Sequence, residues 1–426
     1  MIRLLQISDI HWRDKLSALD SFKHIRDGLV EDVKRAQQQE KLTFNRILIC
    51  GDVAFSGAEE QYKRAEKFIR ELCEVTGLNY KEDVFVVPGN HDKNWYEGAK
   101  EVRELINRYV IEMKDPNEAL GQWLKNDLHS ASLLFGPFKN YDKFVEKFGC
   151  AEPLMHRMNN ELMNSKSVYS EDEDKLYWCD DLAEINGYKI LLYGLNSALF
   201  SDKEDYDTSE ARKYGHQMVL SKLAYNEVSR KDGEVNVMMM HHPMPYIYGG
   251  EKLKDELDKL YHIQLYGHVH VAKSDNNNNR IHIFSGAMQP DEMGTGEEYR
   301  PIYNIIEIDI ENGDEKHDKL NVKLQERCWN GTIFQNYRDE QDYTVKLPKY
   351  KWKREEMTET RILPEGVTKH TIRVKLINHG RAKSIITKLA PDFYDENLPK
   401  YYNVMRFLEK VRLENKWKEL WDAMEE

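Results

Sequence analysis

The chain lacks the features that mark secreted, disulfide-bonded or membrane-spanning proteins. Its 426 residues include five cysteines, which lie far apart and form no C-x-x-C pair. This spacing fits neither a disulfide framework nor a zinc knuckle, and it favours buried, reduced thiols. No run approaches the roughly 18 apolar residues of a membrane-spanning helix, and the opening MIRLLQISDIH is too polar for a signal peptide. We expect a cytoplasmic protein without a membrane segment.

The chain also lacks an excess of positive charge. It carries 62 basic and 74 acidic side chains, a net charge of -12 at pH 7. Proteins that bind duplex DNA gain much of their affinity by neutralising phosphates with lysine and arginine. The composition therefore disfavours a protein that binds nucleic acid on its own, although a basic partner could supply the missing charge.

Short apolar runs alternate with longer amphipathic stretches, a pattern typical of a layered α/β domain. Helical periodicity is clear over residues 18–37, where Phe22, Ile25, Leu29 and Val33 recur on one face. The core strands that we predict span residues 2–8, 46–51, 84–88, 189–195, 235–240, 263–267 and 281–286.

The chain is too long for one ordinary domain, and its character changes along the sequence. Residues 97–165 contain helical stretches and no convincing strand, so we expect a helical cap inserted between strands. Residues 344–426 hold 18 basic and 13 acidic side chains, a net charge of +5, against -17 for the rest. We predict an α/β domain over residues 1–335, a linker or edge strand over 336–370 and a small helical module over 371–426.

The end of the chain has two apolar stripes at the spacing of amphipathic helices, with Asn415 at the expected break. The stripes consist of Val404, Phe407, Leu408 and Val411, and of Trp417, Leu420, Trp421 and Met424. Residues 381–424 look somewhat like the effector-associated, death-like helical domains that recruit partners in bacterial defence proteins. That resemblance implies a module for a protein partner. A brace packed on the α/β domain is the alternative.

Polar side chains follow five of the predicted strands, in the motifs DIH, GDV, GNHD, HHP and GHVH. Because a site in an open α/β sheet lies outside the carboxyl ends of its strands, we expect these residues to converge. The polar residues are Asp9 and His11, Asp52, Asn90, His91 and Asp92, His241 and His242, and His268 and His270.

This donor set predicts a dinuclear metal centre. Asp9 and Asp52 supply carboxylates, Asn90 supplies an amide, and the histidines add at least four imidazoles. A set so rich in nitrogen suits Mn, Fe, Zn, Co or Ni better than it suits calcium or magnesium. Any single motif could be an ordinary turn, but five in succession, each after a strand, are hard to explain by chance.

The five motifs resemble those of the calcineurin-like metallophosphoesterases, whose run is D-x-H, GD, GNH followed by D or E, a histidine in a segment like HHP, and GHxH. The likeness spans residues 1 to about 310 and is specific at the level of the superfamily. It implies a four-layer αββα sandwich, here with a helical cap and a small helical C-terminal appendage. It also implies two divalent transition-metal ions, with Mn as the first expectation.

The resemblance assigns roles to individual residues. Asp52 would bridge two metal ions, His91 would protonate the leaving group, and Asp92 would fix the tautomer of His91. The remaining ligands would be Asp9, His11 and His270 on one ion, and Asn90, His241 and His268 on the other.

Three residues are weaker candidates for substrate binding. Arg13 could meet a phosphate, or it could be a solvated surface arginine. Asn196 ends a strand near the same crevice, where it could line the site or form a turn. His242 is not the expected ligand, because in the family the ligand stands two positions before the proline. It would be a neighbour of the ligands or a structural residue.

The activity that we expect is hydrolysis of nucleotide, cyclic-nucleotide or nucleic-acid phosphodiesters by a metal-bridging hydroxide. A phosphomonoesterase, a protein phosphatase, or a nuclease subunit acting with a partner in a bacterial defence system are alternatives. A non-catalytic scaffold is a rival of another class. Such a protein should have lost ligands, and here every family position is filled.

Overall fold

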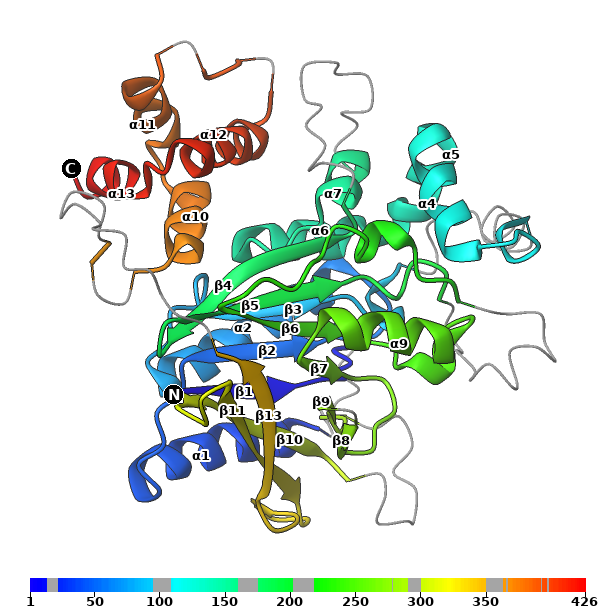
Figure 1. Ribbon diagram of the computed structural model, residues 1–426, viewed down its shortest axis with the longest axis vertical. Coiled ribbons are helices and arrows are strands. Elements are labelled where there is room, and N and C mark those ends of the chain that lie inside the picture. Colours follow the sequence, from blue (N-terminus) through cyan, green and yellow to red (C-terminus); the bar gives the residue numbers. More distant parts are fainter. Residues whose placement is uncertain are drawn as a thin grey trace.

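The structure is a computed structural model, and it places two mixed β-sheets against each other with helices around them (Figure 1). Phe85 of the first sheet stacks on Trp178 of the second, with 5.7 Å between the ring centroids. The fold confirms the predicted α/β class and is consistent with the expected sandwich. The described residues are 1–13, 22–94, 109–159, 175–201, 218–277, 279–289, 300–349, 363–364, 367–391, 393–396 and 398–426.

The first sheet has the strand order β12-β11-β10-β1-β2-β3, with β13 also paired to β11. Strands β1, β2 and β3 run parallel and are almost wholly buried, as their continuous apolar sequences require. The strands are β1 (Ile2–Ile7), β2 (Arg46–Cys50), β3 (Val84–Val87), β10 (Ile302–Glu311), β11 (His317–Trp329), β12 (Phe334–Asn336) and β13 (Gln341–Pro348).

The second sheet has the order β4-β5-β6-β7-β9-β8. Strands β5, β6, β7 and β9 are parallel, and β8 and β9 form an antiparallel hairpin. The strands are β4 (Tyr177–Ile185), β5 (Tyr188–Leu195), β6 (Glu234–Met240), β7 (Ile263–Tyr266), β8 (Lys273–Asn277) and β9 (Arg280–Phe284). All seven predicted strands are therefore present, whereas β4, β8 and β10 to β13 had no counterpart among the predicted core strands.

Within the range predicted for a helical cap, residues 109–159 are described, and they are helical. Residues 109–159 form α4 (Pro116–Asn126), α5 (Leu128–Phe135), α6 (Lys139–Val145) and α7 (Pro153–Asn159), joined by short 3-10 turns. Two longer helices, α1 (Lys23–Gln39) and α2 (Glu59–Thr76), contribute their apolar faces to the main core. Helix α9 (Gly250–Leu260) connects β6 to β7.

The end of the chain forms four helices with a hydrophobic core of their own. They are α10 (Lys369–Asn378), α11 (Ala382–Leu389), α12 (Lys400–Glu414) and α13 (Trp417–Glu425). Ile372, Val404, Phe407 and Leu420 lie in this second core, apart from the main one. Asn415, with φ of 51°, ends α12 at the predicted break.

The helical module also docks on the α/β domain. On α10, the ring of His370 forms a hydrogen bond with the buried carboxylate of Asp180 in β4, and Arg373 forms an ion pair with the same carboxylate. On α12, Tyr401 packs on the ring of His156 in the cap, with 4.3 Å between centroids. The module is thus a separately cored unit that braces its neighbour, and recruitment of a protein partner by it stays a prediction.

The expectations about the cysteines and about a membrane segment can both be compared with the described residues. The five cysteines carry free thiols, and all but Cys179 are buried. Among the described residues, no helix combines the length and the apolar character needed to cross a bilayer.

Removing a core side chain of the helical module should unfold that module before the α/β domain. Phe407→Ala should cost about 3–5 kcal/mol, the usual loss for a buried phenylalanine. Differential scanning calorimetry should then show an added, earlier transition, while the metal content stays near that of wild type. Lys410→Ala, a partly exposed change on the same helix, should cost at most about 0.5 kcal/mol. If Phe407→Ala instead lost its metal and the whole chain unfolded in one transition, the two cores would not be separate.

Candidate metal centre

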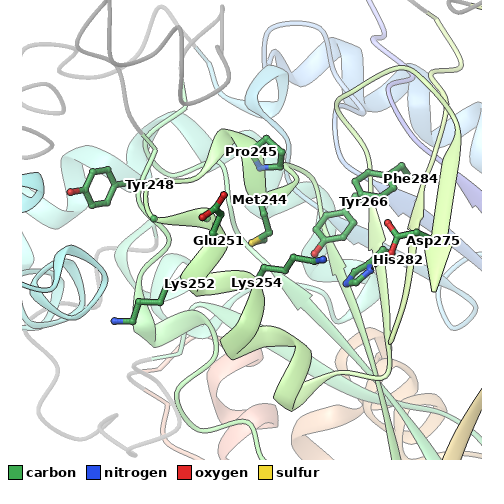
Figure 2. Close-up of a pocket in the computed structure, with 12 residues that line it drawn as sticks. Met244, Pro245, Tyr248, Glu251, Lys252, Lys254, Tyr266, Asp275, His282 and Phe284 are labelled. Atoms are coloured by element: carbon green, nitrogen blue, oxygen red, sulfur yellow. Dashed lines mark hydrogen bonds and ion pairs between the residues drawn. The ribbon is translucent and has the colours of Figure 1, made fainter. Parts of the chain in front are cut away.

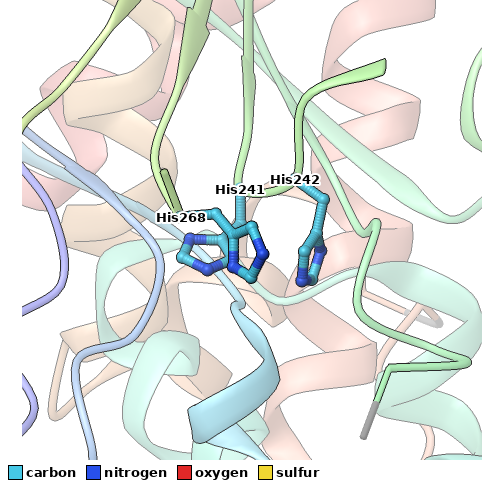
Figure 3. Close-up of side chains that lie close together, drawn as sticks. All are labelled: His241, His242 and His268. Atoms are coloured by element: carbon cyan, nitrogen blue, oxygen red, sulfur yellow. The ribbon is translucent and has the colours of Figure 1, made fainter. Parts of the chain in front are cut away.

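The motif residues meet at one end of the two sheets, where β1, β2, β3, β6 and β7 finish. Their ligand atoms form overlapping groups in which all atoms lie within 4.8 Å of one another. The groups are Asp9 with His11 and His270; His11 with Asp52 and His91; Asp9 with Asp52 and His241; and His241 with His242 and His268 (Figure 3).

Asp52 lies at the centre of this cluster and is almost fully buried. Its Oδ1 accepts a hydrogen bond from the backbone N–H of His91 at 2.8 Å. Its Oδ2 lies 3.2 Å from Nε2 of His241 and 3.9 Å from Nε2 of His11. One carboxylate therefore contacts three other loops and faces candidate ligands on two of them, which is the position that a bridging ligand needs.

Asp9 faces the histidines of the last motif. Its Oδ1 lies 3.1 Å from Nε2 of His270 and 3.8 Å from Nε2 of His11. Its Oδ2 accepts the backbone N–H of His268 at 3.2 Å and contacts the hydroxyl of Ser8. The geometry thus brings together the three side chains expected on the first ion.

Asn90 opens the short 3-10 helix η1 (Asn90–Asp92) directly after β3, and its side chain is buried. The next backbone N–H, that of His91, is bonded to Asp52, so Asn90 joins the cluster from the β3 side. His241 donates from Nδ1 to the carbonyl of Cys50 at 2.7 Å, which turns its Nε2 toward Asp52. These placements agree with the ligands expected for the second ion, and the assignment itself stays a prediction.

Backbone strain is concentrated on the candidate ligands. Nine described non-glycine residues have positive φ, and five of them are Asp9, His11, Asp52, His268 and His270, with φ between 49° and 68°. This left-handed region is sparsely populated by side-chain-bearing residues and persists only where the surroundings impose it. Here hydrogen bonds between loops impose it, since Asp9 N–H and His11 N–H donate to the carbonyls of Gly51 and Asp52.

Two glycines let the loops approach closely enough for these contacts. A Cβ on Gly89 would lie 2.1 Å from Oδ1 of Asp52. A Cβ on Gly51, whose φ is 90°, would lie 2.4 Å from Nδ1 of His241. The glycines of the GD and GNHD motifs are therefore required by space at the centre of the site.

The charges of the cluster are coupled. Burial alone would raise the pKa of the Asp52 carboxyl, but His241 and His91 hold it well below its ordinary value. Burial alone would lower the pKa of His241, but Asp52 raises it to about 10. Since ligands must be deprotonated to bind a metal, a cation would displace the proton of His241, and this donor set suits a divalent transition metal.

The structure corrects the role predicted for Asp92. Its carboxylate accepts hydrogen bonds from the backbone N–H groups of Ala54 and Gly89 and from the hydroxyl of Tyr62, at 2.9 to 3.1 Å. The ring of His91 is instead oriented by the carbonyl of Phe55, 2.8 Å from its Nδ1. Asp92 thus links the GD and GNHD loops, because its carboxylate oxygens accept hydrogen bonds from the backbone of both loops.

The three weaker candidates for substrate binding lie in different surroundings. Asn196 is turned away from a substrate role, because its amide donates to Glu152 at 3.0 Å and its carbonyl accepts the N–H of Ala198. His242 is buried beside the ligands, with Nδ1 2.9 Å from the hydroxyl of Ser197. Arg13 is exposed, and its guanidinium lies 3.9 Å over the ring of Phe55.

Sequence reasoning missed Phe55, Ser8 and Lys93. Phe55 acts through its carbonyl, which its side chain does not reveal. Ser8 directly precedes Asp9, so a hydroxyl beside a ligand was the available signal. Lys93 follows the GNHD motif, and its buried ammonium donates to the carbonyls of Leu199 and Ser201 at 3.1 and 2.7 Å.

Comparisons with known proteins agree with the motifs. A family model described as calcineurin-like phosphoesterase matches residues 2–272. No curated protein matches the chain. Solved structures similar to this chain include three with TM-scores between 0.28 and 0.37. Membership of the family follows from the match to the family model.

The three structures come from different organisms. A Vps29 single mutant from Entamoeba histolytica has 11% identity and a TM-score of 0.34, covering 80% of this chain and 99% of that one. A predicted phosphoesterase from Streptococcus pneumoniae has 10% identity and a TM-score of 0.28, covering 80% and 97%. GAP50, the anchor in the inner membrane complex of Plasmodium, has 13% identity and a TM-score of 0.37, covering 83% and 90%.

Adding one methyl group at Gly89 should disable metal binding without unfolding the chain. Gly89→Ala forces its Cβ against Asp52 and should lower the bound metal from two ions to one or none per chain. Gly136→Ala is the matched control, because a Cβ there meets nothing within 4 Å. Elemental analysis of both purified variants is the measurement. Full metal content in Gly89→Ala would show that Asp52 can bind metal without the space that the glycine at position 89 leaves for its carboxylate.

Proposed function

The chain belongs to the calcineurin-like phosphoesterase family, and from this premise we propose that it is a dinuclear metal-dependent phosphodiesterase. The observation that carries the proposal is the position of Asp52. Its carboxylate faces His241 on one side and His11 on the other, so two groups of ligands share one buried oxygen pair. Asp9, His11 and His270 would hold one ion, and Asn90, His241 and His268 the other.

Two bound divalent cations would supply an activated water and would hold the phosphate oxygens during an in-line displacement. The chain itself supplies the proton for the leaving group. His91 keeps its Nδ1 on the carbonyl of Phe55, so its Nε2 is the atom that can carry a transferable proton. Its ring lies beside that of the ligand His11, with 4.4 Å between centroids, and its side chain is not fully buried. This position suits a general acid.

Charge favours a diester over a monoester as the substrate. A phosphodiester carries one negative charge near neutral pH, whereas a phosphomonoester carries up to two. The whole chain has a net charge of -12, so it repels the more highly charged substrate more strongly. Arg13, exposed above Phe55 and beside the His91 loop, is the cation that we propose to meet the non-reacting part of the substrate.

The substrate class can be tested with matched chromogenic esters. The full-length protein, reconstituted with Mn, should hydrolyse bis(p-nitrophenyl) phosphate with a kcat/KM at least about tenfold above that for p-nitrophenyl phosphate. Both substrates release the same chromophore, so the comparison isolates the number of ester bonds. A preference for the monoester would overturn the phosphodiesterase proposal, and no turnover of either ester would overturn the enzymatic one.

Replacing His91 should slow the reaction without removing the metals. His91→Asn should lower kcat by about 10²- to 10⁴-fold on a diester with a poor leaving group, the usual effect of losing a general acid. The loss should shrink for p-nitrophenolate, which leaves without a proton. Equal losses on both leaving groups, at full metal content, would assign His91 to phosphate binding instead.

A further inference from the structure

A large cavity lies next to the metal centre, on the side of the second sheet (Figure 2). Its volume is about 710 Å³, a size typical of sites for small organic ligands. It opens between the first half of α9 and the hairpin of β8 and β9. None of the seven expected metal ligands lines it, so it is a feature distinct from the ion sites.

Two loops of the metal centre also form walls of the cavity. Met244 and Pro245 follow the HHP motif, and Tyr266 immediately precedes the GHVH motif. Tyr246, the residue after Pro245, packs its ring edge-on against that of His268 with 4.3 Å between centroids. The cavity therefore shares the loop after β6 and the end of β7 with the candidate metal ligands His241 and His268.

The opposite walls of the cavity are linked by hydrogen bonds. His282 of β9 lies between two carboxylates, with Nδ1 2.8 Å from Asp275 of β8 and Nε2 3.0 Å from Asp258 of α9. Gln264 of β7 donates to the same oxygen of Asp258 at 2.7 Å. Helix, hairpin and central strand are thus held together, and a ligand would meet a preformed site that costs little to organise.

The cavity combines an aromatic wall with charged side chains of both signs, Lys252 and Lys254 with Glu251 and Asp275. Tyr266 and Phe284 stack with 5.0 Å between centroids, and Met244 adds a polarisable side chain near them. The ammonium of Lys254 reaches into the space between Met244 and Tyr266 (Figure 2). Among the described residues Lys254 has no hydrogen bond or ion pair, whereas Lys252 on the same helix lies 3.8 Å from Glu256.

Lys254 is half-buried and forms no ion pair within the described part of the chain, because the nearby carboxylate of Asp258 is already bonded to His282 and Gln264, so its ammonium favours an anionic ligand. The aromatic and thioether groups around it favour a planar ring on that ligand. A nucleotide has both parts, a heteroaromatic base and a phosphate. Nucleotide units are also joined by the phosphodiester bonds on which a phosphodiesterase would act.

We propose that this cavity binds a nucleotide unit, with the base against the wall of Met244, Tyr266 and Phe284 and a phosphate facing Lys254. The proposal names the substrate class of the metal centre, a dinucleotide or oligonucleotide end whose scissile phosphate lies at the ions. The statement about the substrate rests on the proposed function. The binding of a nucleotide to the cavity is independent of that function.

Equilibrium binding of adenosine 5′-monophosphate tests the cavity without catalysis. Isothermal titration calorimetry on the full-length protein, with Mn and after its removal, should detect binding in both states. Lys254→Met should weaken it about tenfold, the value of one hydrogen bond to a charged group. Lys259→Met, on the same helix but outside the cavity, should leave it unchanged. Adenosine and ribose 5-phosphate should each bind at least about tenfold more weakly.

Either of two binding results would overturn the nucleotide site. One is equal affinity in Lys254→Met and Lys259→Met, and the other is ribose 5-phosphate binding as tightly as the nucleotide. The substrate statement has its own measurement. Lys254→Met should raise KM for a dinucleotide about tenfold more than KM for bis(p-nitrophenyl) phosphate, and equal changes would contradict it. Absence of all hydrolysis with intact nucleotide binding would overturn the proposed function and leave the cavity's ligand in place.

Discussion

The buried carboxylate of Asp52 is the contact on which the rest of the site depends. It accepts the backbone N–H of His91 and faces the imidazoles of His241 and His11, so it joins loops that are far apart in the chain. Asp9 brings a second buried carboxylate into the same cluster, and two such charges repel each other in a dry interior. Surrounding imidazoles offset this repulsion, and bound cations would offset it further. The site is therefore built to hold positive charge.

The fold serves this contact by bringing strand ends together and by tolerating strain there. Parallel strands β1, β2 and β3 end side by side, and β6 and β7 end opposite them in the second sheet. Left-handed backbone at five candidate ligands and close approach at Gly51 and Gly89 would each be costly alone. Hydrogen bonds between the loops, including those to Asp92, keep these conformations.

Sequence reasoning found the elements whose signal is local and missed those that depend on orientation. The parallel strands were recognised because burial on both faces gives continuous apolar runs. Strand β11 was missed although its residues alternate between buried and exposed, because its buried face also carries the acidic side chains of Asp318 and Glu326, which interrupt the apolar pattern. The motifs identified the candidate ligands, but adjacency in sequence gave Asp92 the wrong partner, and Asn196 forms the turn that was its alternative. No side-chain pattern could have revealed that the Phe55 carbonyl orients His91.

The central claim is that one carboxylate joins two ion sites into a single dinuclear centre. Electron paramagnetic resonance of the protein titrated with Mn tests it most directly, because ions about 3.5–4 Å apart, bridged by a shared ligand, are magnetically coupled. We predict that the signal of isolated Mn is replaced, at two equivalents per chain, by the many-line spectrum of a coupled pair. The spectrum of isolated Mn persisting at two bound equivalents would contradict the shared position of Asp52.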